Sequence, residues 1–153
     1  MNAYYRNGDR AKAYEAALKL KITKDPALKL SALTLQALSS IAAGSLAEAE
    51  AVCSEISNPA AKLYLQASLQ RARQQPEAAI QTAVELIADH PNDMLWMPLT
   101  ELLCAELYLD LGMTNSAEAT ARQTETFYAG TSIGKEAQVL RQNIKQLTEQ
   151  PEE

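Results

Sequence analysis

The sequence is poor in the residues that build metal and phosphate sites. Its 153 residues include two cysteines, one histidine and five glycines, and only 5% of the residues are aromatic. They form no Cys/His cluster of the kind that holds zinc, and the isolated glycines form no phosphate-binding loop. Apolar residues nevertheless make up 47% of the chain. The alanine-rich composition therefore argues against both a disordered chain and a β protein, and it predicts closely packed helices.

Long apolar runs are missing as well. No run approaches the roughly 20 residues that span a bilayer, and Asn2 to Lys12 lacks the apolar segment of a signal peptide. We therefore expect no membrane insertion and a cytoplasmic location. Cys53 and Cys104 fall on apolar helix faces two repeats apart, so their Cα atoms should lie beyond the roughly 7 Å limit of a disulfide. Free buried thiols suit a reducing compartment.

Charge is unevenly distributed along the chain. The net charge is −5, but residues 1–31 carry seven Lys/Arg against three Asp/Glu, and residues 32–153 carry seven against sixteen. An acidic body disfavours a nucleic-acid partner, because affinity for phosphates depends on a basic surface. The basic segment of residues 1–31 either binds an acidic partner or forms a solvent-exposed helix face.

What the sequence does contain is a repeated pattern of helix breaks. Prolines recur 33 and 32 residues apart in Asp25-Pro26, Asn58-Pro59 and His90-Pro91. Midway lies a second break followed by an alanine: Gly8-Asp9 before Ala13, Gly44-Ser45 before Ala49, Gln74-Gln75 before Ala79, and Gly112-Met113 before Ala117. A repeat near 34 residues that is broken in the middle predicts helix–turn–helix pairs stacked into a solenoid.

The stretch NAYYRNGDRAKAYEAALKL resembles the tetratricopeptide repeat (TPR) family. Tyr4, Gly8, Ala13, Ala17 and Leu20 occupy that family's aromatic and small packing positions. The resemblance extends from residue 2 to about residue 128. It implies an all-α fold, a right-handed α-α superhelix of about 3.5 helical pairs, closed by a C-terminal capping helix. It also implies an adaptor or scaffold function, since proteins of this family usually bind other proteins.

Local signals predict the helix boundaries. Pro26 should begin a helix capped by Asp25, and Ser45 and Glu48 should form a capping box for the next helix, which runs to about Ser57. Further helices are expected near 60–73, 76–89, 115–128 and 133–149, with one more ending at Leu111. Glycines 8, 44 and 112 should have positive φ, and alanines 49, 79 and 117 should be buried.

Two segments leave alternatives open. Met94 to Met97 is either an exposed apolar patch or, as we favour, part of the core. The first repeat is incomplete, since only Asn2 to Asn7 precede Gly8. Either the chain is the C-terminal part of a larger, bacterial-type protein, as we favour, or another chain completes this edge. Residues 1–149 are expected to form one domain, followed by a disordered tail at 150–153.

The resemblance also implies a binding groove on the concave side, lined by the first helix of each repeat. The family's ligand positions fall on Tyr5, Arg6, Thr34, Leu38, Tyr64, Ser68, Arg71 and Glu106, with Asn2, Ile41, Leu102 and Leu109 alongside. Thr34 and Leu38 stand where a carboxylate-binding subtype needs polar or basic groups, so we do not expect that subtype. A groove with Tyr64 and Arg71 suits an extended or helical peptide. Alternatively, these side chains only pack between repeats.

Few residues suggest chemistry. His90 precedes a proline in a predicted turn and is expected to be solvated, as is the pair Glu106 and Asp110 on one helix face. Without a positioned nucleophile and base, we expect no enzymatic activity, cofactor or metal.

The favoured function is a protein-interaction module that binds a peptide or protein segment. The alternative is a self-association domain that pairs through its N-terminal edge into a homo-oligomer.

Overall fold

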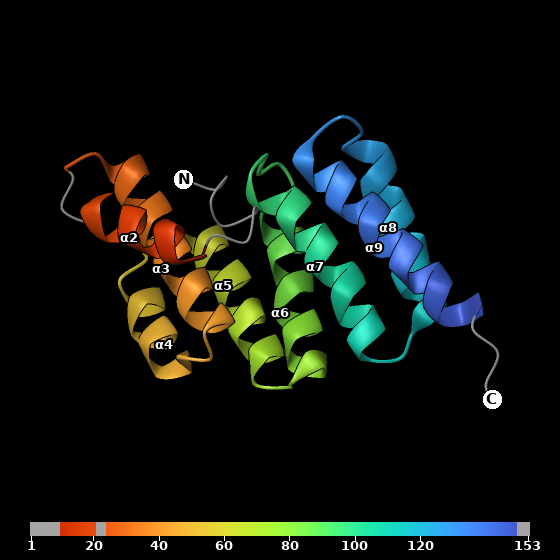
Figure 1. The fold of residues 1–153 in the computed structure, drawn as a ribbon. Helices are drawn as coiled ribbons and strands as arrows, with labels where there is room; N and C mark the ends of the chain where they lie inside the picture. The colour runs from red at the N-terminus through yellow and green to blue at the C-terminus, as the bar shows by residue number, and fades with distance from the viewer. Residues whose placement is uncertain (1–9, 21–23, 150–153) are drawn as a thin grey trace. The chain divides into compact units, whose positions relative to one another are not determined.

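The described part of the chain is entirely helical. In a computed structural model, residues 10–20 and 24–149 are described. Their helices are α2 (Arg10–Leu20), α3 (Pro26–Ala42), α4 (Leu46–Ser54), α5 (Pro59–Ala72), α6 (Pro76–Asp89), α7 (Trp96–Asp110), α8 (Thr114–Phe127) and α9 (Ser132–Glu149) (Figure 1). Short connections join α3 to α8 in sequence at the predicted breaks. The all-α prediction is confirmed for these residues, none of whose helices is long and apolar enough to cross a membrane.

The helices belong to two compact units. The N-terminal unit, residues 1–74, contains α2 to α5, and the C-terminal unit, residues 75–153, contains α6 to α9. In the N-terminal unit α3 contacts α2, α4 and α5, and α4 also contacts α5. In the C-terminal unit α7 contacts α6, α8 and α9, and α8 packs along α9. The cores of the two units are therefore built around α3 and α7.

Proline and a short polar side chain start two of the helices. Asp25 Oδ1 accepts hydrogen bonds from the backbone N–H groups of Ala27 at 2.9 Å and Leu28 at 3.2 Å, and Pro26 takes the first turn of α3. Asn58 caps α5 in the same way, because its Oδ1 accepts from Ala61 N at 2.8 Å. These bonds satisfy backbone donors that a helix leaves unpaired at its start.

At the breaks in the middle of the repeats, the backbone adopts the left-handed conformation with positive φ. Gly44 has φ +77° and Gly112 has φ +71°, as predicted, whereas Gly8 lies outside the described residues. Gln74 takes φ +58° at the break where the sequence has no glycine. Residues with a side chain rarely adopt this conformation, so the break at residue 74 keeps the left-handed turn without a glycine.

The predicted capping box at the start of α4 is wrong. The Ser45 side chain makes no capping hydrogen bond, and its backbone has φ −82° and ψ 61°. The capping residues Asp25 and Asn58 instead have ψ of 117° and 119°. The Ser45 backbone therefore does not adopt the extended geometry in which a hydroxyl usually reaches the N–H groups of the first turn. In addition, α4 ends at Ser54 rather than near Ser57.

Small side chains at the predicted positions are fully buried. Ala49, Ala79 and Ala117 each have 0% exposed surface, which confirms the prediction. Larger residues fill the remaining core. The largest fully buried apolar side chains are Leu35, Leu65, Leu86, Leu107 and Ile144.

The start of α7 corrects in part the expectation that Met94 to Met97 belongs to the core. Asp93 Oδ1 accepts from Leu95 N at 3.0 Å and Trp96 N at 2.9 Å, and this cap fixes the helix start. Trp96 is 4% exposed, but Met94 is 88% and Leu95 54% exposed. The segment is thus split, with Trp96 in the core and the two residues before it on the surface.

The last helix covers part of α7. Leu102 of α7 lies in one cluster with Ile133 and Ala137 of α9, and Leu99 and Leu140 pack against that cluster. This arrangement agrees with an α9 that packs its apolar face on the helices before it. Leu147 lies seven residues after Leu140, a spacing that puts the two on one side of the helix, but it is 62% exposed, so the buried face ends before it.

Candidate functional site

One face of α3 is neither buried nor fully exposed. Leu30, Thr34, Leu38 and Ile41 are half-buried, and their spacing of four, four and three places them on one face of the helix. The rest of the helix from Ala32 onward is largely buried. We call these four residues the α3 stripe. Three of its members were predicted. Leu30 was missed, although its position four residues before Thr34 was a usable signal.

A second half-buried face lies on α5. Tyr64, Ser68 and Arg71 are half-buried, and their spacing of four and three again gives one face. The Ser68 hydroxyl donates to the Tyr64 carbonyl oxygen at 2.9 Å, so its hydrogen bond stays within the helix. The chemical character of this face therefore comes mainly from the phenol of Tyr64 and the guanidinium of Arg71.

The two faces belong to neighbouring helices of the N-terminal unit, because α3 and α5 contact each other. We call the α3 stripe together with Tyr64, Ser68 and Arg71 the α3–α5 face. Neither α3 nor α5 contains an aspartate or glutamate, whereas together they contain Lys29, Lys62 and Arg71. Of these three basic residues, only Arg71 belongs to the α3–α5 face, whose other members are aliphatic, aromatic or hydroxyl-bearing.

The remaining predicted site residues lie in other parts of the chain. Tyr5 and Arg6, like Asn2, lie outside the described residues. Glu106 is half-buried on α7 in the C-terminal unit. Leu102 is only 7% exposed and packs in the cluster with α9. The prediction that Leu102 lines a groove is therefore wrong, because α9 covers that side of α7.

Buried hydroxyl groups without a hydrogen-bond partner distinguish α3 from the other described helices. Thr34 Oγ1, Ser39 Oγ and Ser40 Oγ are buried and have no hydrogen-bond partner among the described residues. Ser40 is 2% exposed. A buried hydroxyl without a partner costs about 1–3 kcal/mol. The N-terminal unit therefore has three buried hydroxyl groups without a described protein partner, on or next to the α3 stripe.

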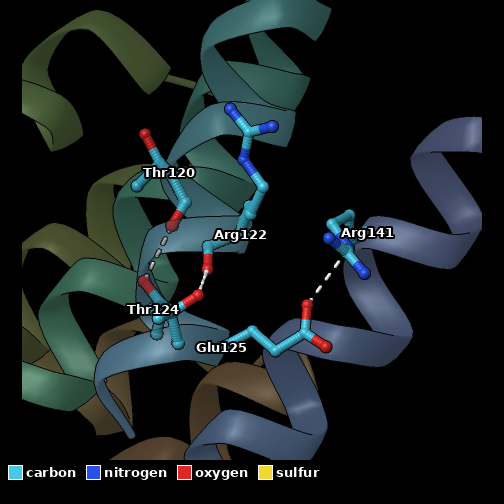
Figure 2. Close-up of polar contacts among 6 residues, drawn as sticks. Thr120, Arg122, Thr124, Glu125 and Arg141 are labelled. Atoms are coloured by element: carbon cyan, nitrogen blue, oxygen red, sulfur yellow. Dashed lines mark hydrogen bonds and ion pairs between the residues drawn. The ribbon is translucent and has the colours of Figure 1, made fainter.

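Polar contacts also join the last two helices. Figure 2 shows Glu125 of α8 and Arg141 of α9 reaching toward each other, with Arg141 Nε and Glu125 Oε2 3.1 Å apart. The two side chains are 27% and 24% exposed, so solvent screens this ion pair only in part. The Thr124 hydroxyl in the same view donates to its own helix, at the Thr120 carbonyl oxygen. The ion pair thus stabilises the contact between α8 and α9.

Three groups have raised pKa values, and burial is the largest cause of each shift. Burial and then the nearby Glu101 carboxylate raise the pKa of Tyr128 to about 12, and the same two causes raise the pKa of Cys104 to about 12. Burial, with Glu50 nearby, raises the pKa of Cys53 to about 11. A catalytic thiol requires a lowered pKa, so neither cysteine is poised as a nucleophile. Both are free thiols.

These pKa shifts predict unreactive cysteines. At pH 8 the native protein should react slowly with iodoacetamide, and Cys104 should react more slowly than half-buried Cys53. Both should react rapidly once the chain is unfolded in urea. Mass spectrometry of quenched time points measures each site. Labelling of native Cys104 as fast as in urea would contradict the burial of its thiol.

The shift of Tyr128 predicts a loss of stability in alkali. Its folded pKa of about 12 lies above the ordinary value of about 10, so folding favours the protonated phenol. Its contribution to stability is fully present below pH 10 and is lost as the pH rises from 10 to 12. The Tyr128→Phe variant should therefore lose less stability over this range than the parent protein. Urea denaturation at pH 9 and at pH 11 measures the stability lost between the two. An equal loss in the parent protein and in Tyr128→Phe would contradict the prediction.

The described residues contain no cluster of three or more His, Cys, Asp or Glu side chains that could hold a metal ion. His90, predicted to be solvated, is half-buried where α6 ends, and its backbone N–H donates to the Leu86 carbonyl oxygen.

Comparison with known proteins finds no matching family model, no matching curated protein and no matching solved structure.

Proposed function

We infer that this chain is a non-catalytic protein-interaction module that binds a peptide or protein segment on its α3–α5 face. The observation that carries this proposal is the α3 stripe: Leu30, Leu38 and Ile41 are half-buried on a helix whose other residues between Ala32 and Ser40 are buried. A tyrosine and an arginine on the neighbouring helix add residue types that dominate protein interfaces.

The proposed architecture is a TPR-like right-handed solenoid. Paired helices, the breaks at Gly44, Gln74 and Gly112, and the buried alanines after them support it. Contacts of α3 with α5 and of α7 with α9 agree with stacking of the first helices of successive repeats. In such a solenoid the first helices line one side, which makes the α3–α5 face a surface for ligands.

Site-specific photocrosslinking tests the proposed function. p-Benzoylphenylalanine replaces Leu38 or Tyr64 in the cell, and irradiation should give the same discrete adduct at both positions. Gln66 is the matched control, because it is exposed on α5 and lies about two residues, or half a turn, away from the face. Adducts that form equally at Gln66, or at Gln66 alone, would contradict binding at the α3–α5 face.

A further inference from the structure

The outer face of α6 is exposed along the whole helix. Six of the 14 residues of α6 are exposed, and the others are half-buried or buried. Helix geometry places these six within one arc of about 140°, so they form one continuous surface. They are Glu77, Gln81, Val84, Glu85, Ala88 and Asp89, and we call them the α6 outer face.

No cation offsets the carboxylates of this face. The chain contains no lysine or arginine between Arg73 and Arg122, a stretch that includes all of α6 and α7. Among the residues that the structure describes, no ion pair involves the side chains of Glu77, Glu85 or Asp89. These three carboxylates are therefore open to a ligand.

The charges at the end of α6 oppose the stability of the helix. Glu85 and Asp89 are four residues apart, a spacing at which like charges repel each other. Asp89 is also the last residue of α6, where the helix dipole favours a cation, and the last turn contains no basic residue. Local rules broken in this way are typical of functional sites. A cation bound between Glu85 and Asp89 would relieve both conflicts.

Exposed apolar side chains accompany these charges. Val84, which is 51% exposed, lies on the α6 outer face. A turn closed by the hydrogen bond from the Asp93 N–H to the His90 carbonyl oxygen follows α6, and Figure 1 shows this turn at one end of the α6–α7 pair. After the turn, Met94 and Leu95 are 88% and 54% exposed. Large apolar side chains are thus exposed at the acidic end of the helix.

We propose that the α6 outer face binds a basic amphipathic segment of another protein. Aliphatic side chains of that segment pack on Val84, and its lysine or arginine side chains lie between Glu85 and Asp89. Charge complementarity selects this partner, because the negative field of the cation-free stretch attracts a basic segment and repels an acidic one. The site lies in the C-terminal unit and does not depend on the α3–α5 face.

Two designed peptides test the charge of the partner. Both are fluorescein-labelled and about 15 residues long, with leucines at helical spacing, and they carry lysine or glutamate at every polar position. Fluorescence anisotropy is measured against the full chain at low and high salt. The lysine peptide should bind at least about tenfold more tightly than the glutamate peptide, and its affinity should fall as salt rises.

A charge reversal at the end of α6 locates the binding. Asp89→Lys should weaken binding of the lysine peptide by about tenfold or more. Glu15→Lys is the matched control, because it changes the net charge of the chain by the same amount at an exposed position of α2, and it should change binding only slightly. Circular dichroism confirms that both variants fold.

The stability of the same variant distinguishes a binding face from a solvated one. Asp89→Lys should raise the urea midpoint of the free chain, because it removes the repulsion from Glu85 and places a cation at the end of the helix. A binding face predicts this gain together with the selective loss of affinity. A gain in stability without that loss would show that the α6 outer face is only solvated, and the inference would fail.

Other results would overturn the inference as well. They are equal affinity for the two peptides, no binding of the lysine peptide, and equal weakening by Asp89→Lys and Glu15→Lys. None of them affects the proposed function, which the crosslinks at Leu38 and Tyr64 test in the other unit. Sedimentation velocity covers a second copy of the chain as occupant. A dimer that Asp89→Lys dissociates would assign the face to a basic segment of another copy, and the inference would again fail.

Discussion

Replacing Leu107 by alanine should lower the free energy of unfolding by about 2–5 kcal/mol. Leu107 is 0% exposed on α7, the helix that contacts every other helix of the C-terminal unit. The variant loses the burial of several methyl and methylene groups and leaves a cavity, because close-packed helices relax only in part. Urea denaturation followed by circular dichroism measures the change.

Leu147 provides the matched control for this substitution. It lies on α9 in the same unit but is 62% exposed, so Leu147→Ala should change the unfolding free energy by no more than about 0.5 kcal/mol. Similar losses for Leu107→Ala and Leu147→Ala would contradict the assignment of α7 as the centre of the unit. They would instead indicate that the apolar face of α9 continues to its C-terminal end.

Helix positions could be predicted from the sequence because they depend on local chemistry. Pro26, Pro59 and Pro76 each fix the first turn of a helix, and Gly44 and Gly112 end helices with a backbone conformation that suits glycine. The failure at Ser45 has an equally local cause. The sequence motif was present, but the backbone ψ needed for the hydroxyl to reach its donors was not.

The candidate site was only partly predictable, because it depends on which helix faces are covered by other helices. The resemblance to TPR proteins, rather than spacing, led us to expect Thr34 and Leu38 in a groove, and both are half-buried. The same reasoning placed Leu102 in a groove, but α9 returns to cover it. Periodicity identifies an apolar face of a helix, whereas long-range packing decides whether another helix or a ligand covers that face.

Gly134 shows a constraint that sequence reasoning did not detect. It lies in the first turn of α9, where its N–H donates to Thr131 Oγ1 at 3.2 Å. A Cβ atom at this position would collide with the backbone carbonyl group of Tyr128, whose carbon would lie only 2.8 Å away. The close approach between the end of α8 and the start of α9 therefore requires a residue without a side chain.

We expect Gly134→Ala to destabilise the protein by about 3 kcal/mol, the upper end of the usual cost of overpacking. The obstacle is backbone rather than a flexible side chain, so the start of α9 must shift. This sign is opposite to the usual one, since alanine normally stabilises a helix interior by about 0.5–1 kcal/mol relative to glycine. Urea denaturation measures the effect, and Gln138→Ala, at an exposed position of α9, should change stability by less than about 0.5 kcal/mol. An alanine at residue 134 that left stability unchanged or raised it would mean that α8 and α9 do not approach each other closely at Tyr128.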